Sequence, residues 1–369
     1  MRLSLCATVA AIVLAAHPAS AQQDKAEQRA AAKFWKSVQA KCDATAAKPA
    51  GDLGVRIAQT AIREFHAFGG HKIDANGRLF HFGLTEAEHE EDDGGGLQAT
   101  VGRLGWWEVM KYWRSLFGTD APRSLEVRGY QDASSAEKES QAAALIRGSA
   151  AQLMSAADKV SDPEAREMLR ESALRAAVID TSWSAAFISY VVKESGVGRN
   201  AFQFSNAHRA YIYDAFAASV AEQDGSNAGE RLYRACPLAT RPRVGDILCQ
   251  HRESKYNNLS DEAARELARK ETAGPPEGRT IRRTHCEVVA HVDTGARKVY
   301  TIGGNANQAV TARKLNLYGR GLKFSAAQGH CGKGEWTMPE PADQLAHGGG
   351  HTQKCSLNDK KWFVLLQLR

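Results

Sequence analysis

Residues 181–197 read TSWSAAFISYVVKESGV, and this stretch constrains the fold more than any other. It predicts a helix that is apolar on nearly all sides, and other elements of the chain have to cover such a helix. Thr181 or Ser182 is placed to cap its first turn, and Gly196 is placed to end it. The residues on either side must therefore supply the elements that bury it.

A strand-rich region follows this helix. Residues 204–220, FSNAHRAYIYDAFAASV, first predict another helix. Apolar runs bounded by Gly, Pro or polar residues then indicate strands. These runs are VGDILCQH (244–251), HCEVVAHV (285–292), KVYTIGG (298–304), AVTARKL (309–315) and WFVLLQL (362–368). Residues 259–279 read as a short helix with a Pro/Gly tail, inserted in the hairpin between the first two runs.

The region before residue 181 is mostly helical in pattern. Apolar residues recur at helical spacing in 24–41, 52–68 and 99–117, and the Ala- and Glu-rich stretch 134–178 reads as two helices. Ser134 or Ser135 is placed to cap the first of these two, Pro163 fits the first turn of the second, and residues 69–98 read as a loop. Helices followed by strands predict an α+β fold, with a helix packed on an antiparallel sheet of about five strands.

Composition excludes several classes of protein. Of the 369 residues, 43% are apolar and 24% charged, which is typical of a globular chain and unlike a disordered one. The formal charge of +6 (48 basic minus 42 acidic residues) is spread along the sequence, so we expect no nucleic-acid partner. The one long apolar run lies at the N-terminus and ends in Ala19-Ser20-Ala21. We interpret residues 1–21 as a signal peptide, and expect a periplasmic or extracellular protein with no membrane span once it is removed.

Export changes how the cysteines are interpreted. Seven cysteines minus Cys6 leave six, an even number that favours disulfides in an oxidising compartment. We expect Cys249 to pair with Cys286, because both lie in strand-like runs, and Cys331 with Cys355, because they are close in sequence. Cys42 and Cys236 remain as the third pair. Buried free thiols are the alternative.

Three pieces of sequence carry the chemistry. Ser184 lies at the start of the apolar helix, His285 at the start of a strand run, and Asn305 directly after Gly303-Gly304. A nucleophile at a helix N-terminus lies near free N–H groups that can stabilise an oxyanion. A histidine on an adjacent strand can take its proton, and a polar side chain on the next strand can orient that histidine.

Several segments together resemble a known superfamily. They are WSAAFISYV (183–191), SNAHRAYI (205–212), RPRVGDILC (241–249), HCEVV (285–289) and IGGN (302–305). In this order they are similar to papain-like cell-wall hydrolases, namely the NlpC-type peptidases and the CHAP amidohydrolases. They are closest to an uncharacterised, secreted bacterial branch of that superfamily. The resemblance covers about residues 180–315 and extends to GWWEVMKYW (105–113).

The resemblance implies a papain-like core that cleaves amide bonds in peptidoglycan peptides or related small amides without a cofactor. It implies Ser184 as the nucleophile, His285 as the base and Asn305 as the orienting residue. The superfamily has Cys where this chain has Ser184, and a serine hydroxyl cannot form the ready thiolate that a cysteine can. The alternative is therefore an inactive papain-like module that binds the cell wall or a partner protein. The oligomeric state stays open.

Other residues have weaker functional interpretations. Trp183, Ser205, His208 and Trp107 are candidates to line the substrate groove, and His208 is also an alternative base. For His208 and Trp107 the structural alternatives are a satisfied helix histidine and a core aromatic. We expect Asp246 to fix the turn into its strand. His66, His71, His81 and His89 lie near the acidic run 86–93, which suggests an exported metal-binding protein as a third function or, more simply, a solvated acidic loop.

The expected organisation has four parts. They are the signal peptide (1–21), an N-terminal helical region (22–132), a helical insertion (133–178) and the papain-like core (179–369). The core carries an inserted segment at 255–282.

Overall fold

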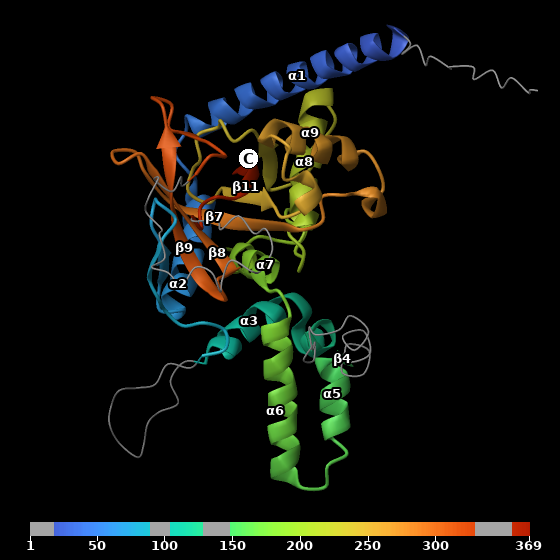
Figure 1. The fold of residues 1–369 in the computed structure, drawn as a ribbon, viewed down its shortest axis with the longest axis vertical. Helices are drawn as coiled ribbons and strands as arrows, with labels where there is room; N and C mark the ends of the chain where they lie inside the picture. Colours follow the sequence, from blue (N-terminus) through green and yellow to red (C-terminus); the bar gives the residue numbers. More distant parts are fainter. Residues whose placement is uncertain (1–17, 89–103, 128–147, 329–355) are drawn as a thin grey trace, which may run out of the picture.

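The structure is a computed structural model, which describes residues 18–88, 104–127, 148–328 and 356–369. The described residues form eight α-helices, a nine-stranded sheet and a two-stranded ribbon (Figure 1). The helices are α1 (Pro18–Ala46), α2 (Asp52–Ala67), α3 (Gly105–Phe117), α5 (Ala150–Ala157), α6 (Pro163–Asp180), α7 (Ser184–Glu194), α8 (Arg209–Asp224) and α9 (Asp261–Thr272). The fold class is α+β, as the sequence predicts.

The longest strands lie in the second half of the chain. They are β1 (His71–Ile73), β2 (Leu79–His81), β5 (Tyr233–Cys236), β6 (Ile247–His251), β7 (Thr284–Asp293), β8 (Lys298–Ala306), β9 (Ala309–Tyr318), β10 (Lys323–Phe324) and β11 (Lys361–Leu368). The ribbon joins β3 (Glu126–Val127) to β4 (Gly148–Ser149). Three 3-10 helices complete the elements: η1 (Gly118–Ser124), η2 (Ser254–Tyr256) and η3 (Pro276–Gly278).

The sheet is larger than expected and is mixed. Its order is β2-β1-β9-β8-β7-β6-β11-β5, and β10 pairs with β9. All five predicted strand runs are present as β6, β7, β8, β9 and β11, and α9 lies in the β6–β7 hairpin as predicted. The expectation of about five antiparallel strands is wrong, because four short strands extend the sheet and β1 runs parallel to β9. Two of these strands come from residues 69–98, which the sequence indicated as loop.

The helix that contains Ser184 begins later than its sequence suggests. The N-cap of α7 is Trp183, and neither Thr181 nor Ser182 caps the helix. Thr181 instead bonds through its hydroxyl to both backbone groups of Glu126 in β3, so its side chain is occupied there. The predicted end is confirmed, since Gly196 follows α7 with a φ of +89°. Pro163 is the first residue of α6, also as predicted.

The helices cover both faces of the sheet. Neighbouring residues of β6 divide between the faces, because side chains alternate along a strand. Ile247 and Cys249 join a large core with α2, α3, α7 and α8, whereas Leu248 joins a smaller core with Val38 and Cys42 of α1. In Figure 1, α1 lies across one end of the molecule, and α5 and α6 extend from the opposite end as a helical pair.

The described residues contain two disulfides. Cys42 of α1 is bonded to Cys236 of β5, and Cys249 of β6 to Cys286 of β7, which confirms two of the three expected pairs. Cys331, Cys355, Ser134, Ser135 and residues 1–17 of the expected signal peptide lie outside the described residues. Within the described ranges, no helix combines the length and the apolarity needed to cross a membrane.

Candidate functional site

Ser184 is positioned by the residue before it. Trp183 is fully buried at the N-cap of α7, where its ring lies against Phe68 and Tyr112. Its indole Nε1 donates a hydrogen bond to the carboxylate of Glu86. The tryptophan therefore fixes the start of α7 from within the core, and it is not exposed to a substrate.

Two adjacent glycines let α7 and a buried ion pair approach β8 closely. A Cβ on Gly304 would lie 2.5 Å from Cβ of Phe187 and 2.7 Å from Cζ3 of Trp183. A Cβ on Gly303 would lie 2.8 Å from Cγ of Glu287 and 3.1 Å from Nε2 of His285. Because Gly303 and Gly304 have no side chains, there is room beside β8 both for α7 and for His285 with Glu287.

Ser184 contacts a histidine, and this histidine is His208. The Ser184 Oγ and the His208 Nε2 are 2.7 Å apart. His208 is buried, and its other ring nitrogen, Nδ1, is hydrogen-bonded to the hydroxyl of Tyr211 one helical turn later. The structure therefore joins Ser184, His208 and Tyr211 in one chain of hydrogen bonds.

The His285 ring packs against the His208 ring. The two rings meet edge to face with their centroids 5.3 Å apart. His285 Nε2 is 3.5 Å from Oε1 of Glu287, which also accepts from Arg313 Nε at 3.1 Å and from the Thr301 hydroxyl through its other oxygen. The carboxylate that contacts His285 thus comes from its own strand, two residues further along.

The charges of these groups follow from their surroundings. Burial, together with His285 and Arg252 nearby, holds the pKa of His208 well below its ordinary value. Burial also lowers the pKa of His285, against the opposing effect of Glu287. For Glu287 burial alone would raise the pKa, but Arg313, His285 and Thr301 outweigh it and lower the pKa to about 2. At neutral pH the site therefore holds two neutral histidines and one carboxylate paired with an arginine.

The remaining predicted residues lie around this group. Asn305 has a left-handed φ of +52° at the end of β8 and lines a cavity of about 120 Å³ beside His285. The other polar lining residues of this cavity include Arg252, Arg313 and Lys360. Ser205 stabilises the turn before α8, where its hydroxyl accepts a hydrogen bond from the Ala207 N–H.

Trp107 and Asp246 lie elsewhere in the fold. The Trp107 side chain is 46% exposed on α3, with the Arg114 guanidinium 4.5 Å from its ring centroid. Asp246 accepts from the N–H groups of Arg243 and Leu368, which confirms its role in fixing the turn into β6.

The histidine-rich N-terminal loop forms backbone contacts. His71 Nε2 lies 2.9 Å from the Gly83 carbonyl oxygen, and His81 Nε2 lies 3.0 Å from that of Gly69. Among the described residues, no three His, Cys, Asp or Glu side chains are grouped as metal ligands would be. His89 lies outside those residues. Glu86 is buried and accepts a hydrogen bond from the Trp183 indole. The interpretation of this segment as a solvated loop is therefore wrong for Glu86.

Sequence reasoning missed three groups of this site. Glu287 follows His285 at the i+2 spacing that puts two strand residues on one face, so the H-x-E pattern was an available signal. Tyr211 follows His208 by three residues, within reach on a helix. Nothing local in the sequence indicates that Glu86, about a hundred residues before Ser184, supports the start of α7.

A family model described as "Uncharacterized protein conserved in bacteria (DUF2272)" matches residues 101–368. The chain belongs to this family. The DUF2272 match includes α3, α7, α8 and strand β7, which carries both His285 and Glu287, and its description states no activity. Comparisons with curated proteins and with solved structures gave no match.

Proposed function

We propose that this DUF2272 protein is an exported amide hydrolase that acts on cell-wall peptide, with Ser184 as the nucleophile. The observation that carries the proposal is the 2.7 Å contact between the Ser184 Oγ and the His208 Nε2 at the first residue of a buried helix. The two disulfides fit an oxidising compartment outside the cytoplasm. The papain-like ancestry that the motifs suggest is part of the same proposal.

In the proposed reaction the Ser184 Oγ attacks the amide carbonyl while a histidine accepts the hydroxyl proton. His208 is in direct contact and stands first as the base. It is competent when Nδ1 carries the ring proton and donates it to the Tyr211 oxygen, since Nε2 is then free to accept. The histidine next gives the proton to the leaving amine, and water hydrolyses the acyl-serine ester. N–H groups in the first turn of α7 stabilise the oxyanion.

His285 and Asn305 have defined places in this scheme. His285, polarised by the Glu287 carboxylate, borders His208 and is the alternative base if substrate binding moves the Ser184 hydroxyl toward it. Asn305 lies with His285 in the cavity that also contains Arg252 and Lys360. Cationic and amide side chains recognise carboxylates, and cell-wall peptides carry free carboxylates.

The test is digestion of purified peptidoglycan, with new amine and carboxyl ends measured. We expect wild-type protein to release ends and Ser184→Ala to fall to background, because no other group replaces the hydroxyl. Ser184→Cys keeps the geometry and should retain activity. The proposal fails if wild type releases no more than Ser184→Ala across pH values and peptide substrates. Comparing His208→Gln with His285→Gln then identifies the base.

One observation favours the second candidate, an inactive module that binds cell wall or a partner protein. His208 is backed by the Tyr211 phenol, whose pKa burial raises well above its ordinary value, rather than by a carboxylate. A neutral phenol stabilises an imidazolium less than a carboxylate does. For this candidate Ser184→Ala would bind peptidoglycan as wild type does in a sedimentation assay, and neither protein would release ends.

A further inference from the structure

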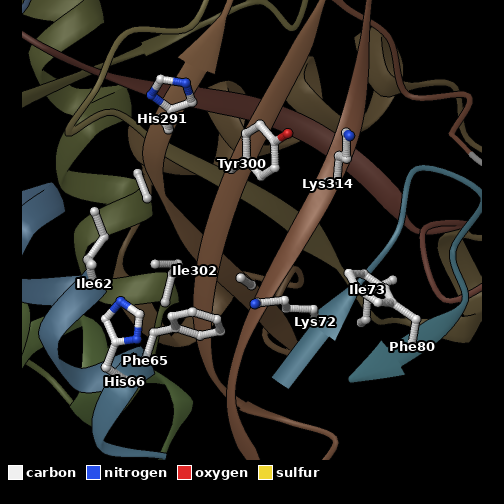
Figure 2. A pocket seen from close by; sticks show the side chains of 12 residues that line it. Ile62, Phe65, His66, Lys72, Ile73, Phe80, His291, Tyr300, Ile302 and Lys314 are labelled. Carbon is white, nitrogen blue, oxygen red and sulfur yellow. The ribbon is translucent and has the colours of Figure 1, made fainter. Parts of the chain in front are cut away.

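A second pocket lies outside the contacts around Ser184. It has a volume of about 440 Å³ and is bounded by α2 and by strands β1, β2, β7, β8 and β9 (Figure 2). This volume is within the range of small-molecule sites. Ser184, His208 and His285 do not line it, so it is independent of the proposed hydrolase.

One part of the pocket is apolar. Ile62 and Phe65 of α2 face Ile302 of β8, and Ile73 and Phe80 lie at the β1–β2 side (Figure 2). The Phe80 side chain is 60% exposed at this edge. Covering apolar surface of this kind with a hydrocarbon group is favourable, because the surface is removed from water.

The other part of the pocket is polar and cationic. His291, Tyr300 and Lys314 lie together on neighbouring strands, away from the Phe65 end (Figure 2). The Lys314 amine is 5.5 Å from the Tyr300 ring centroid, and the His291 ring is 5.7 Å from it. Lys72 of β1 adds a second amine over the pocket (Figure 2). Among the described residues that line the pocket, none is an Asp or Glu.

We propose that this pocket binds an amphipathic monoanion, namely a medium-length acyl chain with one carboxylate. The chain lies along Phe65 and Ile302, and the carboxylate lies between the Lys314 amine and the Tyr300 hydroxyl. Charge complementarity decides this occupant, because the lysines repel an organic cation and gain nothing from a neutral chain. The Lys72 amine also attracts the carboxylate, but more weakly, because it is more exposed to solvent.

The experiment titrates the full chain with decanoate, octanoate and decyltrimethylammonium in a calorimeter, below the concentrations at which these compounds aggregate. We expect decanoate to bind and decyltrimethylammonium to bind at least tenfold more weakly. Octanoate, which is two methylenes shorter, should bind about tenfold more weakly than decanoate. Equal affinity for the anion and the cation, or no binding of decanoate, would overturn the proposal.

Variants locate the site. Lys314→Gln should weaken decanoate binding about tenfold, and Lys72→Gln by a smaller factor. Lys323→Gln, an exposed lysine of β10 that does not line the pocket, is the matched control and should bind as wild type does. Ala312→Leu, which enlarges a side chain that lines the pocket without changing its charge, should also weaken binding, and it tests the site if Lys314→Gln fails to fold.

Two further outcomes would contradict the proposal. If Lys314→Gln and Lys323→Gln bind decanoate equally, the ligand lies elsewhere. If sedimentation finds a dimer that Ala312→Leu disperses and decanoate does not, a second copy of the chain covers the pocket instead.

Discussion

At the scale of single residues, Glu86 is a buried carboxyl that accepts a hydrogen bond from the Trp183 indole. Burial, opposed by the Trp183 N–H and reinforced by Asp180, raises the pKa of Glu86 to about 7. In the unfolded chain the same group ionises near its ordinary value of 4.5. The folded protein therefore keeps a proton that the unfolded chain has already released over this pH range.

Glu86 therefore makes the free energy of unfolding depend on pH. The contribution of Glu86 to stability is complete below about pH 4.5 and is lost as pH rises through about 7, because rising pH favours the state that has released the proton. We expect the free energy of unfolding to fall by on the order of 3 kcal/mol from this group. Glu86→Gln keeps the acceptor for Trp183 and should lack this component.

Urea unfolding between pH 4.5 and 8.5 measures the difference. Burial also raises the pKa of Asp246 to about 7. Asp246 therefore adds a similar pH dependence of the unfolding free energy to both proteins, and this contribution cancels when they are compared. Parallel pH profiles for wild type and Glu86→Gln would contradict the assignment.

Arg252 is the exposed cation of the cavity beside His285. If the substrate presents a carboxylate there, Arg252→Gln should raise KM about tenfold with little change in kcat, since one charge-assisted hydrogen bond is lost. Arg283→Gln changes an exposed arginine that does not line the cavity and should leave KM unaltered. Steady-state kinetics on amidated and free-acid peptides provides the measurement, and the amidated peptide should make the two variants equal.

At the scale of elements, the position of α7 depends on the close approach at Gly304. Gly304→Ala puts a methyl group within 2.5 Å of the Phe187 Cβ, so either α7 or β8 has to shift. We expect a loss of about 1–3 kcal/mol of unfolding free energy. Because Ser184 begins α7, its contact with His208 should lengthen and any hydrolase activity should fall.

Gly198→Ala is the control for that substitution. A Cβ there meets no atom within 4 Å, so its stability should match wild type in the same denaturation experiment. Equal stability of the two variants would mean that α7 has more room over β8 than the structure indicates.

The same elements mark what the sequence can predict. The apolar pattern of α7 and the five long strand runs are strong sequence signals, because each of these elements buries a continuous apolar surface. The three-residue strands β1 and β2 lie among glycines and polar residues, and only the pairing of β1 with β9 and of β2 with β1 makes them strands. Likewise Ser184 was identifiable from its segment, but its contact with His208 depends on how the turn at Ser205 aims α8.

At the scale of the whole molecule, one disulfide closes a loop of just over half of the chain. Cys42 and Cys236 are 194 residues apart and join α1 to the edge strand β5, whereas Cys249 and Cys286 are 37 apart within one hairpin. In the chain-entropy account, a cross-link restricts the unfolded chain more when it closes a longer loop. The logarithmic dependence on length gives the longer loop an advantage of about 1.5 kcal/mol.

Replacing each pair by alanines tests this argument. Both pairs are buried, so the cost of the lost sulfur contacts is similar and the difference reports the loops. We expect Cys42→Ala/Cys236→Ala to lose about 1.5 kcal/mol more unfolding free energy than Cys249→Ala/Cys286→Ala. Under reducing conditions wild type should lose at least as much as either variant. If the hairpin variant is the less stable of the two, native packing between β6 and β7 outweighs loop entropy, and α1 is held on the sheet by Val38 and its apolar neighbours rather than by the cross-link.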